Sequence, residues 1–193
     1  ITVGGANIRA AIIGTTDRET TTKLRAWLKQ GASAITTLYG RFPVAEIQAL
    51  LVPVGPKDDP VPWGEVMRGG GDAVHLYVDQ TKPLDMLNNN WVLTHELSHL
   101  IHPYGMGADA WLSEGIASYY QNVLRARAEM ISATTAWKKL HAGFRRGIKQ
   151  TVAQQTLASD TRSMMRRGQY MRVYWSGAAI ALIADTALRI RSD

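Results

Sequence analysis

Two histidines and a glutamate stand close together near the middle of the chain, in the segment His95-Glu96-Leu97-Ser98-His99. On a helix, a spacing of four residues places both imidazoles on one face, where they can bind a single metal ion. Glu96 lies roughly 100° further round such a helix, so it is not a natural third ligand. Its carboxylate can instead reach a water bound to the ion, which is the position of a general base.

The residues around this segment predict a largely buried helix. The side chains of Asn88, Asn89 and Asn90 can cap its N-terminus. Pro103 and Gly105 are expected to end it. The alternative is a core helix with two satisfied histidines. The apolar positions are Trp91, Val92, Leu93, Leu97, Leu100 and Ile101.

A catalytic zinc usually takes three protein ligands and leaves a fourth position to water, so the two histidines need a partner from elsewhere. Glu114 is the best candidate, because the fourteen residues between it and His99 (100–113) allow a turn and a returning helix that Asp109 caps or leads into. Apolar neighbours suggest that its carboxylate points inward, where it needs a partner or a metal. The alternative is a solvated acid at a helix start.

The other histidines are expected to be ordinary polar positions. His102 is followed directly by Pro103 and is interpreted as helix-terminal or as a support for the ligands. His75 alternates with apolar residues in a strand, and His141 belongs to a basic helix. We therefore expect metal ligands only at His95, His99 and Glu114.

The segments 95–99 and 111–120 together resemble the catalytic core of gluzincin metallopeptidases, in the clan of the membrane alanyl aminopeptidases and the glycyl aminopeptidases. A third segment, 174–179, resembles the Tyr-x-Lys-Gly-Ala segment of those families. The resemblance implies a zincin-like catalytic domain, Zn²⁺ as cofactor and hydrolysis of peptide bonds by metal-activated water. It also implies that the hydroxyl of Tyr174 stabilises the oxyanion, with Tyr170 as the alternative. Ser98 or Ser118 could support the metal ligands by hydrogen bonds.

The chain also departs from these families. The alanyl aminopeptidases have eighteen residues between the second histidine and the glutamate, and a strand whose glutamate holds the substrate amine. The corresponding stretch here, 68–78, contains no glutamate, so aminopeptidase specificity does not follow. Asp72 could play a related part or simply be a turn aspartate. Gly70 and Gly71 could let a substrate backbone approach an edge strand, which makes these three residues the predicted substrate-binding residues, or could form a mobile loop.

Two other functional classes remain open from the sequence. One is a catalytically silent gluzincin-like module that binds peptides or regulates. The other is a basic scaffold protein in which the motif is accidental. Substrate preference, and whether cleavage is terminal or internal, are also open, and nickel or cobalt would fit the same donors.

Length and composition agree with the one catalytic domain that the resemblance implies. The 193 residues, 46% of them hydrophobic, can bury a core without disulfides, and the lack of cysteine excludes a thiolate zinc site. No apolar run approaches the ~20 residues of a membrane span, and Ile1 begins no signal peptide. Since Ile1 is not Met, we expect a processed chain or a cut piece, in which an upstream domain could be missing. The compartment is open, with a periplasmic or secreted location slightly favoured over the cytoplasm, and so is the oligomeric state.

The net charge of +6 comes mostly from basic residues late in the chain. Such runs on helices are usually solvated faces, and no recognition motif for nucleic acid accompanies them. We therefore expect a peptide or protein substrate and no nucleic-acid partner. Arg166, Arg167 or Arg172 could instead face the cleft and bind a substrate carboxylate.

The order of patterns along the chain predicts an α+β fold. A small mixed sheet in the N-terminal half (1–85) packs against a mainly helical half (86–193) that carries the metal site, all within one domain, 1–193. The pattern from residue 88 onward is helical, with breaks near Gly105, Met130 and Ser159. The expected earlier elements are strands at 8–13, 44–54 and 73–79, a helix at 17–39 and a long loop at 53–71.

Overall fold

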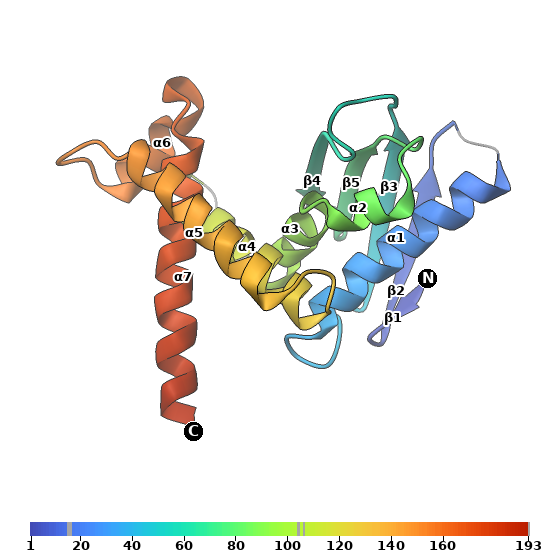
Figure 1. Ribbon diagram of the computed structural model, residues 1–193, viewed down its shortest axis with the longest axis horizontal. Helices are drawn as coiled ribbons and strands as arrows, with labels where there is room; N and C mark the ends of the chain where they lie inside the picture. Colours follow the sequence, from blue (N-terminus) through green and yellow to red (C-terminus); the bar gives the residue numbers. More distant parts are fainter. Residues whose placement is uncertain (15–16, 104, 106, 193) are drawn as a thin grey trace.

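The computed structural model describes residues 1–14, 17–103, 105 and 107–192 (Figure 1), and over these residues the fold is α+β, as predicted. A five-stranded sheet occupies the N-terminal half and helices form the C-terminal half. The strands are β1 (Thr2–Val3), β2 (Ala6–Ile12), β3 (Glu46–Pro53), β4 (Trp63–Met67) and β5 (Ala73–Val78). The helices are α1 (Arg18–Thr36), α2 (Leu84–Asn89), α3 (Val92–Ser98), α4 (Ala110–Arg127), α5 (Ala133–Lys149), α6 (Leu157–Arg167) and α7 (Tyr170–Ser192).

The sheet has the strand order β1-β2-β3-β5-β4, with β4 at one edge. Strand β3 pairs in parallel with β2 and β5, whereas β4 pairs antiparallel with β5. The prediction of one long loop at 53–71 is therefore wrong for Trp63–Met67, which form β4. That strand carries no clear alternation of buried and exposed residues, because it lies at the sheet edge and is only half-buried through most of its length. Period-two hydrophobicity, the signal used to find strands, is weak at such a position.

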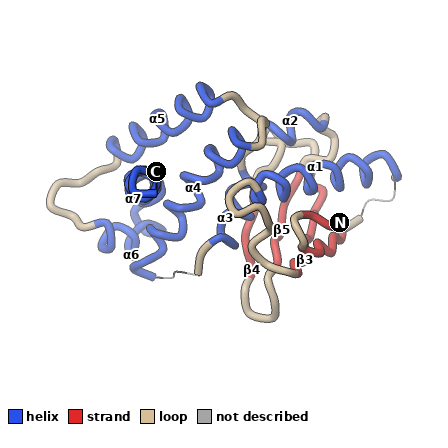
Figure 2. Tube along the Cα trace, turned by 90° about the horizontal axis from the view of Figure 1, so that it is seen from below, coloured by secondary structure: helices blue, strands red, loops and turns tan. Residues whose placement is uncertain are grey.

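One face of the sheet packs against helix α1. The side chains of β2 and β3 alternate between buried and exposed, so each strand turns one face to the core. The helix begins after Asp17, whose carboxylate caps the N–H of Thr20, and ends three residues before the predicted Tyr39. The indole Nε1 of Trp27 in this helix donates to the carbonyl oxygen of Leu87 in α2 at 3.1 Å. Figure 2 shows α1, α2 and α3 on the same side of the sheet.

The helix that carries the histidine pair is shorter than predicted. Asn88 and Asn89 belong to the preceding helix α2, and only Asn90 fulfils the capping role, by accepting the N–H of Val92 at 2.8 Å. Helix α3 ends at Ser98 and continues as a 3₁₀ turn, His99–Ile101. His102 is already extended (φ −133°, ψ 160°), because the residue before a proline is restricted away from the helical region. The predicted turn at 103–107 lies partly outside the described residues.

The helical half is built around the contact of α4, α5 and α7, which Figure 2 shows grouped together. The predicted break near Met130 is confirmed between α4 and α5. The break predicted near Ser159 lies a few residues earlier, between α5 and α6, because Thr156 caps α6 and accepts the N–H of Ser159 in its first turn. A further break at Gly168 (φ 64°) was not predicted.

Helix α7 projects from the rest of the molecule (Figure 1), and its C-terminal half exposes apolar residues such as Ile183 and Ile190. By length and composition alone, Tyr170–Arg191 could cross a membrane, which the sequence analysis did not expect. Core helices meet the same criterion, and the N-terminal half of α7 packs against α4 and α5. The expectation that the chain has no membrane span stays a prediction.

Candidate metal centre

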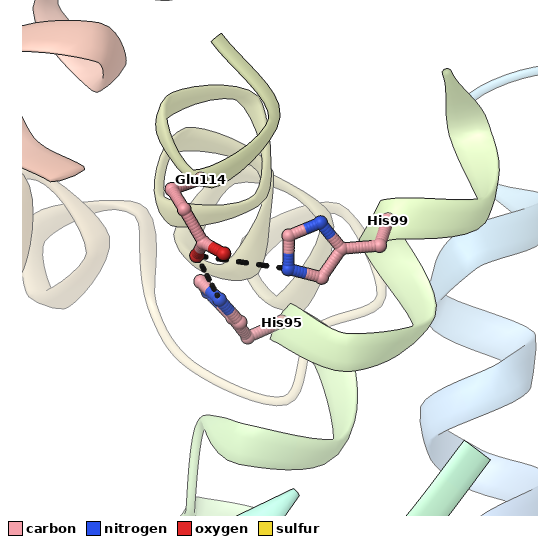
Figure 3. Close-up of side chains that lie close together, drawn as sticks. All are labelled: His95, His99 and Glu114. Atoms are coloured by element: carbon pink, nitrogen blue, oxygen red, sulfur yellow. Dashed lines mark hydrogen bonds and ion pairs between the residues drawn. The ribbon is translucent and has the colours of Figure 1, made fainter. Parts of the chain in front are cut away.

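Three side chains from two helices converge on one point (Figure 3). The Nε2 atom of His95 lies 3.3 Å from Oε2 of Glu114, and Nε2 of His99 lies 3.7 Å from the same oxygen. All three candidate ligand atoms lie within 4.8 Å of one another. The structure thus brings together the three residues that the sequence analysis selected, from α3, the turn that follows it and α4.

The spacing of these atoms fits a tetrahedral metal ion. Two donors that each lie about 2.1 Å from one zinc ion, at a tetrahedral angle, are about 3.4 Å apart. The two nitrogen–oxygen distances to Glu114 bracket this value. Imidazole nitrogen and carboxylate oxygen are also the donors expected for zinc in a chain without cysteine. These residues can therefore hold a metal ion.

The charge states of the donors favour the same role. Burial and the neighbouring His95 lower the pKa of His99 to about 3, so its ring is neutral and offers a lone pair. Burial also opposes the charged forms of His95 and Glu114, but their mutual hydrogen bond and the charges of neighbouring groups together outweigh it. The pKa of His95 is accordingly raised and that of Glu114 lowered. This arrangement is a proton-bridged pair whose proton a cation would replace.

The Nδ1 atoms of both imidazoles point to other partners, which orients their Nε2 atoms toward Glu114. Nδ1 of His95 lies 2.7 Å from Oε1 of the buried Gln121, and Nδ1 of His99 lies 3.1 Å from Oγ of Ser113. A protonated Nδ1 donates to each oxygen and leaves Nε2 free to bind metal. The supporting residues differ from those suggested by the sequence, because the hydroxyl of Ser98 donates to the carbonyl oxygen of Thr94.

We expect Gln121→Leu to weaken Zn²⁺ binding about 10–100-fold, because it removes the acceptor that orients His95. Gln121→Glu keeps an acceptor at the same place and serves as the conservative control. Competition titration of each purified variant with a chromogenic zinc chelator measures the affinity. Equal weakening in both variants would show that Gln121 acts through packing and not through this hydrogen bond.

Glu96 lies beside the three donors without joining them. It is 9% exposed and lines the same cavity as His95, His99 and Glu114. Its pKa is raised to about 7, chiefly by burial and also by the nearby carboxylates of Glu114 and Glu65, against the lowering effect of His95. A carboxylate with a pKa near neutrality and access to the donors is suited to proton transfer.

Tyr174 also lines this cavity, from helix α7. Its hydroxyl lies near the Glu114 carboxylate, and its ring stacks on that of His95 with centroids 6.1 Å apart and an interplanar angle of 11°. Burial and the charge of Glu114 raise the pKa of Tyr174, so the phenol stays protonated and able to donate. Tyr170 stands one turn earlier, with its ring 6.4 Å from that of Tyr174.

Two glycines allow α4 and α7 to approach closely enough to bring Tyr174 to Glu114. A Cβ atom at Gly115 would lie 2.4 Å from the Cα of Gly177, and one at Gly177 would lie 2.2 Å from the carbonyl oxygen of Trp111. Both contacts are shorter than side chains tolerate, so the crossing requires glycine on both helices. Gly115 follows Glu114 directly, and Gly177 lies about one turn after Tyr174.

We expect Gly177→Ala to lower the free energy of unfolding by about 1–3 kcal/mol, the usual effect of overpacking. Alanine stabilises a helix by roughly 1 kcal/mol relative to glycine, so any net loss of stability comes from the close contact between α4 and α7. Chemical denaturation followed by circular dichroism measures this change, with the exposed Ile180→Ala as control. An unchanged or raised stability of Gly177→Ala would contradict the importance of the close approach.

The cavity in front of the metal centre has a volume of about 540 Å³. Its lining includes three charged residues that the sequence analysis did not select: Glu65 at the edge strand β4, Arg68 just after it and Arg162 on α6. Arg68 donates to the carbonyl oxygens of His99 and His102, and so fixes β4 to the end of the metal-binding segment. The position of β4 at the sheet edge could not be read from the local sequence.

The predicted substrate-binding residues Gly70, Gly71 and Asp72 lie in the turn between β4 and β5. They are not among the residues that line the cavity, and their role stays a prediction. Among the arginines considered for the cleft, Arg172 pairs with Asp160 at 3.3 Å instead. The histidine His75 pairs with Glu65 at 3.4 Å, as an ordinary polar residue of β5.

Comparisons with known proteins agree with this geometry. Residues 104–180, which include Glu114 and Tyr174, match the family described as M61 glycyl aminopeptidase. The whole chain superposes on an aminopeptidase N family protein from Idiomarina loihiensis with a TM-score of 0.70 at 19% sequence identity, which shows a shared fold. The chain spans 37% of the length of that protein. No curated protein sequence matches the chain.

Proposed function

We propose that this chain is a zinc-dependent metallopeptidase of the gluzincin type, in which His95, His99 and Glu114 hold the ion. The observation that carries the proposal is the convergence of these three donors in one cavity with Glu96 and Tyr174. The match of residues 104–180 to a peptidase family and the aminopeptidase-like fold support it. We also propose that residues 1–193 act as one catalytic unit.

Glu96 is the proposed general base. When bound at this site, zinc supplies a positive charge that acidifies a water ligand and polarises the scissile carbonyl. Glu96 accepts the proton of the attacking water and delivers it to the leaving amine. Its burial keeps competing solvent away, and its raised pKa brings the carboxylate close to the proton affinity that such a shuttle needs.

Tyr174 is the proposed donor to the developing oxyanion. Tyr174 lines the cavity with its hydroxyl near the Glu114 carboxylate, so it can donate a hydrogen bond to a substrate oxygen that arrives beside the donors. A preorganised donor in a water-poor site is most effective where negative charge appears during the reaction.

The edge strand β4 is the proposed docking site for the substrate backbone. Gly64, Glu65 and Val66 of this strand line the cavity, and among the described residues β4 pairs on one side only, with β5. An extended peptide can add to such an edge through main-chain hydrogen bonds. A Cβ at Gly64 would lie 2.7 Å from Cγ of Glu96, so this glycine keeps the base close to the strand.

Hydrolysis of a mixed peptide library, with free and blocked N-termini, tests the proposal. We expect turnover that a chelator such as 1,10-phenanthroline abolishes and that added Zn²⁺ restores. Peptide binding without turnover in the zinc-loaded protein would instead favour the second candidate function, a silent peptide-binding module. Comparison of free with blocked N-termini also decides between terminal and internal cleavage.

A further inference from the structure

A second cavity, of about 300 Å³, adjoins the metal centre on the Nδ1 side of His95. Tyr174 lines both cavities. Gln121, which binds Nδ1 of His95, also lines the second cavity. Trp91 lines it too, and its ring stands perpendicular to that of His95, with the ring centroids 5.3 Å apart. The second cavity is therefore separated from the metal donors only by the side chains of the site itself.

The lining of this second cavity combines neutral and cationic groups. Helix α4 contributes the buried polar residues Ser118 and Asn122, and Trp175 of α7 contributes an aromatic wall. Helix α5 contributes two cations, Lys139 and Arg146. The guanidinium of Arg146 lies 5.0 Å from the centroid of the Trp175 ring, a stacking that holds this flexible side chain in place.

The two cations have no carboxylate within 4 Å among the residues that the structure describes. Elsewhere in this part of the chain, carboxylates do pair with arginines, as in the contacts of Arg172 and Arg189. A pair of positive charges at a cavity, without internal counter-charges, favours an anionic ligand. Guanidinium and ammonium groups both bind carboxylates.

We propose that the second cavity is a subsite for an acidic side chain of the peptide substrate, with the carboxylate of a glutamate or aspartate bound by Lys139 and Arg146. This inference rests on the proposed peptidase function. Tyr174 lines both cavities, and one extended residue spans about 3.3–3.6 Å, so the side chain assigned to the second cavity is that of a residue next to the scissile bond. The aromatic wall then contacts the methylene groups of that side chain.

A matched set of peptides tests the subsite. Peptides that carry Glu, Gln, Ala or Lys on either side of one cleavable bond are compared by kcat/KM with the zinc-loaded wild-type protein. We expect Glu to be preferred over its neutral isostere Gln by about fivefold to tenfold at one of the two positions, the effect of a partly exposed ion pair. Lys at that position is expected to be the poorest substrate.

The variants Lys139→Gln and Arg146→Gln assign the preference to the cavity. Each is expected to reduce the ratio of Glu to Gln cleavage, and the double variant to bring it to about one, with Ala peptides cleaved as in the wild type. Lys138→Gln and Arg145→Gln are the matched controls, because they remove the same charges one residue away, outside the cavity lining. These controls are expected to keep the wild-type ratio.

The outcomes separate the two proposals. Absence of cleavage of every peptide would overturn the proposed function itself. Cleavage without a preference for Glu over Gln would overturn only the subsite. A preference that survives in the double variant, or that falls equally in the two controls, would also overturn the subsite, because the charge would then act from elsewhere.

Discussion

Glu96→Gln is expected to lower kcat/KM for a cleaved peptide by about 10²–10⁴-fold, the usual contribution of a general acid–base group. The amide has nearly the same volume as the buried carboxylate, so the cavity and the donors His95, His99 and Glu114 keep their places. What disappears is the ability to accept a proton. Steady-state hydrolysis by equal amounts of zinc-loaded wild type and variant measures the change.

Glu46→Gln is the control for this result, because Glu46 lies on the exposed side of β3 and pairs with Arg9. It is expected to retain wild-type activity. The zinc content of Glu96→Gln should also equal that of the wild type, since Glu96 is not a ligand. Hydrolysis by Glu96→Gln at the wild-type rate would mean that another group accepts the proton.

Tyr174→Phe is expected to lower kcat by about 10²–10³-fold, as is usual when one preorganised oxyanion donor is removed. The ring remains and still stacks on His95, so the change isolates the hydroxyl. Since the hydroxyl acts mainly on the developing charge, KM is expected to change much less than kcat. Full progress curves at several peptide concentrations separate the two constants.

Tyr170→Phe is the matched comparison, because Tyr170 lies on the same helix, its ring contacts that of Tyr174, and the sequence left it as the alternative donor. Tyr170 is not among the residues that line the metal cavity. The variant Tyr170→Phe is expected to reduce kcat less than threefold, because its side chain lies outside the cavity. A large loss in Tyr170→Phe with normal kcat in Tyr174→Phe would reverse the assignment.

The cluster of three candidate metal ligands could be predicted from the sequence because its information is local. Spacing of four residues fixes His95 and His99 on one helical face, and the structure needs only one change of helix type to place them. Glu114 could be selected because a carboxylate among apolar neighbours needs a partner. The α+β order of the chain followed from the change of hydrophobic period near residue 88.

The parts that were missed depend on contacts between distant segments. Strand β4 is defined by its pairing with β5. For this reason neither the strand nor the place of Glu65 in the cavity could be predicted from the local sequence. The roles of Ser113 and Gln121 depend on how α4 crosses α3, which no local pattern encodes. Likewise, the second cavity arises where α4, α5 and α7 meet beside Trp91, so the basic residues of α5 looked like an ordinary solvated face.

Metal content is the most direct test of the central claim that His95, His99 and Glu114 together bind one cation. Elemental analysis of protein purified without chelator, then incubated with Zn²⁺ and desalted, is expected to give about one zinc per chain, in line with a three-ligand site. The variants His99→Ala and Glu114→Ala, checked for folding by circular dichroism, are expected to lose most of it. Wild-type protein that retains no zinc, or folded variants that retain as much as the wild type, would contradict the account.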